Sequence, residues 1–200
     1  DVISAFANQL LEFKTIDDVL WGIAKYAVAK LEYDDCVIYL YDKDEGCLVQ
    51  RAAHGPKNPV EFDIINKITL KLGEGICGDV AQTGIGEIVN DTSIDYRYVE
   101  DNKEGLSEIT VPILIDGKVI GIIDSEHRLK NFYSSQDLKV LTAISSMLST
   151  KLGHIFSYQE LERRNKNLEQ RVLNKTKKLQ DHIDELENSY EEIQQQNLEN

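Results

Sequence analysis

The sequence predicts an α+β protein in which flanking helices cover a central antiparallel sheet and a long helix follows the sheet. Three observations favour this fold. Residues 107–127 read SEITVPILIDGKVIGIIDSEH, the pattern of a β-hairpin around an Asp-Gly turn. Two amphipathic helical patterns precede the first strands, and no proline interrupts the helical pattern that ends the chain.

The hairpin turns at Asp116 and Gly117, because both central residues of a type I′ turn need a positive φ. A two-residue loop pairs Ile115 with Lys118 and leaves apolar residues on both faces of the hairpin. Such a hairpin belongs in the middle of a sheet with a layer on each side. Pro112 has no N–H group, so we expect its strand to be locally unpaired or bulged there.

Polar residues gather at the ends of the two hairpin strands, far from the turn. The two-residue loop predicts a register in which Glu108 lies opposite Ser125. In that register Asp124 and Glu126 point to the other face, so the carboxylates surround one end of the sheet without all converging. A solvated strand end explains this pattern as well as a ligand site does.

Two helices are predicted before the sheet, and further strands are predicted around the hairpin. The first helix starts near Val2, and the second follows Thr15, whose side chain can cap it together with Asp18 three residues on. Trp21 on the second helix is expected to lie in the core or at an interface. Strands are expected over residues 36–41, 47–53, 68–72 and 87–90. The polar loop over residues 91–105 is long enough to form a functional lid.

A glycine-rich turn over residues 73–78, GEGICG, matches the G-x-G-x-x-G pattern of dinucleotide sites. The helical segment after it is cut off at Gly84, so no complete βαβ crossover can be built. The glycines instead favour a short helix lying tight against the edge of the sheet. Ile76 and Cys77 would then face the space beneath that helix.

The amino-acid composition indicates which binding partners and which cellular compartment to expect. The formal net charge of −13 argues against nucleic acid and against an anionic membrane surface. Three cysteines without a C-x-x-C pair indicate neither a disulfide framework nor a zinc site, so we expect a reducing cytoplasm, with Cys36 and Cys47 as small buried hydrophobic residues. No apolar run approaches a membrane span of about 20 residues. The chain opens without Met or a signal-peptide pattern, so we expect an excised piece of a longer protein.

The motifs S-E-I-x-V-P-I, D-G-K-V-I-G-I-I-D and G-E-G-I-C-G resemble those of a GAF domain, a fold related to that of PAS domains. The resemblance covers residues 1–156 and leaves residues 157–200 as a separate helical linker. It implies a ligand pocket beneath the short helix and the loop over residues 91–105. The candidate ligand-binding residues are Tyr39, Ile76, Cys77, Tyr98, Glu108, Thr110, Asp124 and Glu126. No metal ligand is assigned, and the cofactor, if there is one, is unknown.

One branch of the GAF family reduces free methionine-R-sulfoxide, and this chain resembles it in part. Cys77, Glu108, Asp124 and Glu126 occupy positions that in the reductase motifs hold a cysteine and the carboxylates that grip the substrate amine. Sulfoxide reduction needs a nucleophilic thiolate and a second, resolving thiol. In the reductases the nucleophile lies shortly before the S-E-I stretch, where residues 99–102 contain no cysteine, and the partner cysteine before the glycine turn is also absent. We therefore assign no catalytic residues.

Other ligands of GAF domains are favoured less by the resemblance. The signature of cyclic-nucleotide sites of the phosphodiesterase type is matched only at Phe132. The four histidines are scattered along the chain, so no convincing anchor for a bilin or a haem is present; they are His54, His127, His154 and His182. The carboxylates near the hairpin ends can still bind a small amine or amino acid without acting on it.

The end of the chain has the pattern of a dimeric coiled coil, and we expect a homodimer that forms through the terminal helices and this coil. Its seam follows spacings of four and three residues through Leu161, Asn165, Leu168, Val172, Leu179, Ile183, Leu186, Tyr190 and Ile193. A spacing of four and four between Leu168 and Thr176 is a stutter, which locally unwinds a supercoil.

Two features of the coiled-coil segment oppose each other. Asn165 at a core position favours a parallel dimer in register, because a buried amide pairs with its twin. Basic residues dominate residues 163–178 and acidic residues dominate residues 181–199, which favours an antiparallel overlap. Because exposed charges contribute little to stability, we favour the parallel dimer, and the antiparallel one stays open as the alternative. Residues 167–180, NLEQRVLNKTKKLQ, resemble the linkers that join sensory domains to histidine kinases.

These observations together predict a sensory or regulatory module. The module binds a small ligand or relays a signal. A dimeric coiled coil connects it to an output domain of the histidine kinase type, which lies outside this sequence. Two alternatives remain: an enzyme similar to the methionine-R-sulfoxide reductases, and a purely structural dimerisation module whose pocket is filled by Tyr39 or Tyr98.

Overall fold

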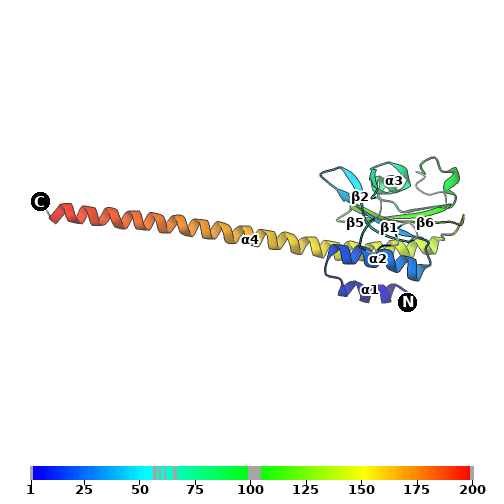
Figure 1. Cartoon of the computed structure of the whole chain (residues 1–200), viewed down its shortest axis with the longest axis horizontal. Coiled ribbons are helices and arrows are strands. Elements are labelled where there is room, and N and C mark those ends of the chain that lie inside the picture. The colour runs from blue at the N-terminus through cyan, green and yellow to red at the C-terminus, as the bar shows by residue number, and fades with distance from the viewer. Residues whose placement is uncertain are drawn as a thin grey trace. The chain divides into compact units, whose positions relative to one another are not determined.

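The computed structural model describes residues 2–55, 58, 60, 62–64, 67–98 and 105–198 (Figure 1). It divides into two units, Asp1–Ile155 and Phe156–Asn200, and one helix continues from the first into the second. The first unit holds a six-stranded antiparallel sheet with helices on both faces. The predicted α+β fold with a long C-terminal helix is therefore confirmed.

The described part of the chain contains helices and strands in alternating groups. In order they are α1 (Val2–Glu12), α2 (Ile16–Leu31), β1 (Cys36–Asp42), β2 (Cys47–His54), β3 (Thr69–Lys71), α3 (Gly75–Thr83), β4 (Glu87–Val89), the 3₁₀ helix η1 (Thr92–Ile94), β5 (Ser107–Ile115), β6 (Lys118–His127) and α4 (Ser135–Leu198). Among the described residues, no helix combines the length and the apolar character that a bilayer span requires.

The sheet has the strand order β3-β2-β1-β6-β5-β4, and every neighbouring pair is antiparallel. The predicted hairpin is β5 and β6, and β1 pairs with β6 at the centre of the sheet. One face packs on α2 and the first turns of α4, where the main hydrophobic core lies, and α1 packs on the outer side of α2. The other face packs on α3 and holds a smaller core around Tyr39 and Ile122. The hairpin is thus covered on both sides, as its apolar faces require.

Helix α2 begins with the capping box that the sequence predicts. The hydroxyl oxygen of Thr15 accepts a hydrogen bond from the backbone N–H of Asp18 at 3.1 Å, and the Asp18 carboxylate accepts one from the N–H of Thr15 at 3.3 Å. The apolar face of α2 is buried, and Trp21 lies in the core as expected. Of the cysteines, Cys36 is fully buried, but Cys47 is only half-buried beside the carboxylate of Glu45, so its prediction as a buried hydrophobic residue was wrong.

The β5–β6 hairpin keeps the predicted register only next to its turn. Asp116 and Gly117 both have positive φ, and Ile115 pairs with Lys118. The ladder then shifts: Ile113 pairs with Gly121, so Ile120 is an extra residue in β6. The one-residue bulge moves every later pair by one position.

The predicted register of the carboxylates was therefore wrong. Glu108 pairs with Glu126 rather than with Ser125, and Thr110 pairs with Asp124. Directly opposed residues of a strand pair point to the same face, so the side chains of these four residues share one face of the sheet.

The bulge lies where the ladder is interrupted in β5. Pro112 offers no N–H to a neighbouring strand, so a regular ladder is already broken at that residue. Helix α4 pairs with backbone groups of the same segment: the Ser145 hydroxyl donates to the Pro112 carbonyl at 2.6 Å, and the N–H of Leu114 donates to the Ser149 hydroxyl at 3.1 Å. The sequence indicated an irregularity at Pro112 but not the direction of the register shift.

Gly121 allows β1 to approach the bulged strand. A Cβ atom at this position would lie inside van der Waals contact of the Tyr39 carbonyl oxygen and the Leu40 side chain. Gly153 on α4 differs, because a Cβ atom there would make only an ordinary contact with Ile115.

We expect Gly121→Ala to lower the free energy of unfolding by about 1–3 kcal/mol, since the strand must shift to admit the methyl group. Gly153→Ala should raise it by about 0.5–1 kcal/mol, because alanine orders a helix more readily than glycine does. Urea denaturation of both full-length variants measures the two effects. Equal stability of Gly121→Ala and the parent would contradict the close approach of β1.

Candidate ligand-binding site

The candidate site lies at the ends of β5 and β6 that are far from the turn. Glu108, Thr110, Asp124 and Glu126 occupy it side by side, and each is at least nine-tenths buried. These residues come together because of the bulge, which places the β6 carboxylates on the same face as Glu108.

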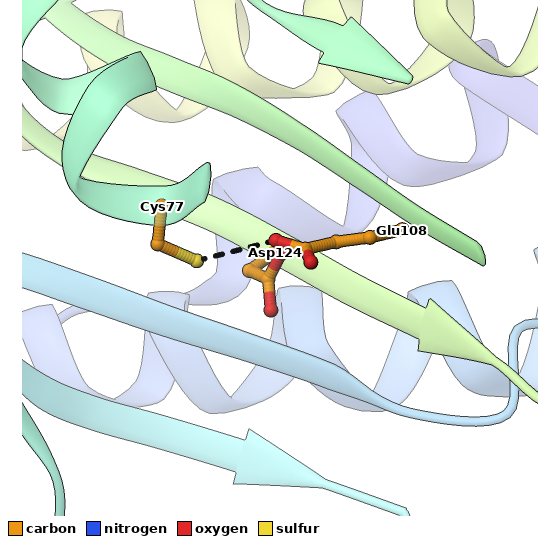
Figure 2. Close-up of side chains that lie close together, drawn as sticks. All are labelled: Cys77, Glu108 and Asp124. Atoms are coloured by element: carbon orange, nitrogen blue, oxygen red, sulfur yellow. Dashed lines mark hydrogen bonds between the residues drawn. The ribbon is translucent and has the colours of Figure 1, made fainter. Parts of the chain in front are cut away.

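Helix α3 brings Cys77 over this face. The helix lies tight against β3, because Gly78 has no Cβ atom to meet the Lys71 carbonyl, as the glycine pattern predicts. The Cys77 thiol donates to Oε1 of Glu108 at 3.7 Å (Figure 2). The sulfur and one oxygen each of Glu108 and Asp124 all lie within 4.8 Å of one another. Such spacing fits one divalent ion, although the sequence assigned no metal ligand here.

Thr110 connects two of the carboxyl groups. Its hydroxyl oxygen lies 2.7 Å from Oδ1 of Asp124 and 3.2 Å from Oε1 of Glu108. A hydroxyl carries one hydrogen, so it cannot give a full hydrogen bond to two ionised carboxylates at once. The arrangement is satisfied when one carboxyl group is protonated.

The pKa values in the cluster favour that protonated form. Burial raises the pKa of Glu108 well above its ordinary value, and the negative charges of Asp124 and Glu126 raise it further. Burial also raises the pKa of the Cys77 thiol, as do the charges of Asp124 and Glu108. Cys77 therefore stays a thiol at neutral pH, which makes it a weak nucleophile.

A cavity of about 70 Å³ opens next to these groups. Seven of the eight residues that the sequence predicted line it: Tyr39, Ile76, Cys77, Tyr98, Glu108, Asp124 and Glu126. The eighth, Thr110, is fully buried and bonds to Glu108 and Asp124. The volume suits a few water molecules or a small polar group. None of the described residues that line it is basic.

The sequence analysis missed four other residues that line the cavity. They are Ile68, Leu70, Glu74 and Gly75. Ile68 and Leu70 carried a signal, since alternate residues of one strand share a face. Asp35 was missed as well: its carboxylate accepts the backbone N–H of Glu126 at 2.7 Å and so helps to position that residue.

Arg97 holds the loop beside the cavity. Its guanidinium group bonds to Asp95 of the same loop, to Glu87 on β4 and to Asp79 on α3, at distances of 2.7–3.1 Å. A guanidinium that bridges three carboxylates fixes the loop geometry more firmly than one exposed ion pair does. Tyr98, the next residue, is thereby positioned at the cavity.

Gly105 brings the returning chain across the same region. A Cβ atom at Gly105 would overlap the carboxylate of Glu126 and would touch the Tyr98 hydroxyl. Only glycine lets the backbone pass this close to the acidic group. Loop residues 99–104, in which the sequence lacks the reductase nucleophile, lie outside the described residues.

A six-stranded antiparallel sheet with helices on both faces and a small polar cavity under α3 defines an α+β domain, and the described strands pair without the parallel βαβ crossover of a dinucleotide site. A family model described as a GAF domain matches residues 14–150. The chain belongs to the GAF domain family.

Two curated proteins are similar to part of this chain. YtsP of Bacillus subtilis (strain 168) is 29% identical over 86 residues, which cover 43% of this chain and 53% of YtsP. The protein named "Probable 3',5'-cyclic phosphodiesterase pde-5" of Caenorhabditis elegans is 24% identical over 159 residues, which cover 74% of this chain and 22% of that protein. The aligned parts thus span about half of the first and about a fifth of the second.

Solved structures agree on the fold. The GAF domain of a phosphoenolpyruvate-protein phosphotransferase from Coxiella burnetii has a TM-score of 0.72 and 16% identity, covering 80% of this chain and 95% of that one. Free methionine-R-sulfoxide reductase from Neisseria meningitidis, in complex with its substrate, has a TM-score of 0.70 and 20% identity, covering 78% and 89%. At these identities the likeness concerns the fold alone.

The raised pKa of Glu108 predicts a dependence of stability on pH. A carboxyl group whose pKa is higher in the folded than in the unfolded protein stabilises the fold fully below the unfolded value of about 4.3. That contribution is lost as the pH rises through the folded value. The Glu108→Gln variant cannot ionise at this position, so it does not lose that contribution. We therefore expect the free energy of unfolding of the variant minus that of the parent to increase as the pH rises from 4 towards 8.

Urea denaturation across that pH range tests this prediction. The exposed Glu12→Gln provides the control, and its difference from the parent should change little with pH. A constant difference between Glu108→Gln and the parent would show that Glu108 titrates like an exposed carboxyl group.

Proposed function

We propose that this chain is a sensory or regulatory GAF module whose acidic pocket binds a small ligand that carries an amine. Three buried carboxyl groups around one cavity carry the proposal: Glu108, Asp124 and Glu126. A buried cluster of acidic groups is unfavourable by itself, and a positive charge offsets the mutual repulsion. The small volume suits an ammonium group with a short substituent, such as an amine or an amino acid.

Hydrogen bonds connect the pocket to the start of α4, within the first unit. Strand β5 carries Thr110 at the pocket and, two residues on, the Pro112 carbonyl that accepts from Ser145 on α4. A ligand that moves the pocket end of β5 would therefore change how the start of α4 packs on this strand.

Strand β6 provides the second connection. The Ser125 hydroxyl donates to the Asp35 carbonyl oxygen and lies 2.8 Å from the hydroxyl of Tyr133, just before α4. Ligand binding that favours one packing of α4 over another would shift the population of signalling states.

The second unit supplies a surface for dimerisation. Every seam residue is exposed in the single chain: Leu161, Asn165, Leu168, Val172, Leu179, Ile183, Leu186, Tyr190 and Ile193. An apolar stripe at heptad spacing is stabilised by burial against the same stripe of a second copy. We propose a homodimeric coiled coil that leads to an output domain of the histidine kinase type. The three free cysteines suit a reducing cytoplasm.

The reductase alternative has less support. The raised pKa of Cys77 disfavours the thiolate that attacks a sulfoxide, and residues 99–104 contain no cysteine. The dimerisation alternative required a pocket filled by its own side chains. The cavity of about 70 Å³ remains open between Tyr39 and Tyr98, which favours ligand binding.

Native mass spectrometry first shows whether the purified protein carries a bound small molecule. Titration calorimetry of the full chain then tests binding of a panel of short primary amines and free amino acids. We expect at least one compound to bind, and Glu108→Ala to weaken it about tenfold or more, since a charge-assisted hydrogen bond is lost. Glu45→Ala, on the β1–β2 turn, is the matched control and should bind like the parent.

Two results would overturn this function. Equal binding of every compound to Glu108→Ala and to the parent would remove the amine site. Turnover of free methionine-R-sulfoxide to methionine, with a thiol reductant present, would instead establish the enzyme.

The dimer is tested by sedimentation equilibrium. We expect the parent to be a dimer and Ile183→Lys to shift towards monomer at the same concentration, because a buried lysine destabilises the seam. Asn188→Lys introduces the same charge off the seam and should remain a dimer. A monomeric parent would contradict the coiled coil.

A further inference from the structure

A second and larger cavity lies on the helical side of the sheet, away from the acidic pocket. Its volume is about 380 Å³, and α1, α2 and residues that follow β2 border it. That volume falls in the range of sites for small organic molecules, whereas the acidic pocket holds only a small group. The two cavities lie on opposite faces of the sheet, so the inference does not depend on the proposed amine site.

Aromatic side chains form much of the wall. The rings of Trp21 and Phe62 lie 5.5 Å apart with an angle of 35° between them, and Phe13 and Tyr26 also border the cavity. The ring of Phe13 can pack directly against the backbone of α2 because Gly22 has no Cβ atom at the contact. A wall of this kind favours a flat apolar ring, which gains contact area at small entropic cost.

Phe62 is held in an unusual way. Its φ is +60°, a conformation that bulky residues rarely adopt, and its side chain remains 60% exposed despite the contact with Trp21. Burial in the core therefore does not account for its position. A planar ligand against the aromatic wall would cover the exposed ring.

The ammonium group of Lys30, at the end of α2, determines the charge of ligand that the cavity favours. Lys30 and Lys25 both border the cavity, and Lys25 has a further interaction within the chain. The one acidic residue among its described lining residues is Asp18, whose carboxylate accepts the N–H of Thr15 at the start of α2. An ammonium group beside an aromatic wall complements an anionic group attached to a ring.

We propose that this cavity, bordered by Phe13, Trp21, Tyr26, Phe62, Lys25 and Lys30, binds a planar aromatic anion of the aromatic carboxylate or sulfonate class. The ring lies against Trp21 and Phe62, and the anionic group meets Lys30. Together with the proposed amine site, this gives the domain two ligand sites of opposite charge preference, one on each face of its sheet.

The single tryptophan of the chain makes the proposal directly testable. Anilinonaphthalene sulfonate serves as the probe, because it is an aromatic sulfonate that accepts energy from tryptophan. We expect it to bind the full chain, to quench the emission of Trp21 and to fluoresce by energy transfer. N-phenylnaphthylamine, which has the same ring system without the sulfonate, separates the contribution of the anion.

Matched variants locate the site. We expect Phe62→Ala and Lys30→Glu each to weaken binding of the sulfonate about tenfold. Tyr96→Ala and Lys43→Glu make the same changes at exposed positions elsewhere and should bind like the parent. Lys30→Glu should leave binding of the neutral dye unchanged. Ala29→Phe fills the cavity from an exposed position of α2, which keeps the core intact, and should abolish energy transfer.

Three results would overturn the proposal. They are equal affinities for the sulfonate in all variants, equal sensitivity of both dyes to Lys30→Glu, and dye binding that falls as the protein concentration rises. The last would mean that a second copy of the chain occupies the groove. Unchanged circular dichroism of the variants confirms that lost binding is not lost folding.

Discussion

One extra residue in a β-strand determines the chemistry of the acidic pocket. Because Ile120 bulges out of the ladder, Glu108 lies opposite Glu126, and Thr110 lies opposite Asp124. Without the bulge, the two β6 carboxylates would point to the other face, into the apolar core under α2 and α4. An unpaired charge in such a core is prohibitively unfavourable, so the register and the pocket depend on each other.

The surroundings of the cluster fix the acidic groups in place. The Arg97 guanidinium holds the loop on one side, Gly105 lets the chain return directly over Glu126, and Asp35 binds the backbone of Glu126 from below. These contacts come from three separate segments of the chain. Each of them restrains the polar end of the pocket through a hydrogen bond or a close backbone approach.

Local signals in the sequence were sufficient for most of the fold. The Asp116-Gly117 turn, the capping box at Thr15 and the tight packing of α3 through Gly78 each follow from the conformational needs of a few neighbouring residues. The family resemblance then brought the candidate residues to one region. The structure places all of them at or beneath one cavity, and their role in binding stays a prediction.

The register and the supporting contacts could not be read from the sequence in the same way. The position of the bulge depends on how closely β1 approaches Gly121 and on which serines of α4 meet Pro112, and both are tertiary facts. Asp35 and Arg97 act through partners many residues away. The aromatic cavity was equally hidden, because Trp21 at its helical spacing indicates only a core residue.

The shared hydrogen of Thr110 has a consequence for what the module measures. In the empty pocket the raised pKa of Glu108 favours a proton on that carboxyl group, which removes one of the crowded negative charges. Under the proposed function, an ammonium group that enters would take the place of that proton and release it. Occupancy would then follow the ratio of ligand to hydrogen ion, so acidification would empty the pocket at a constant amount of ligand.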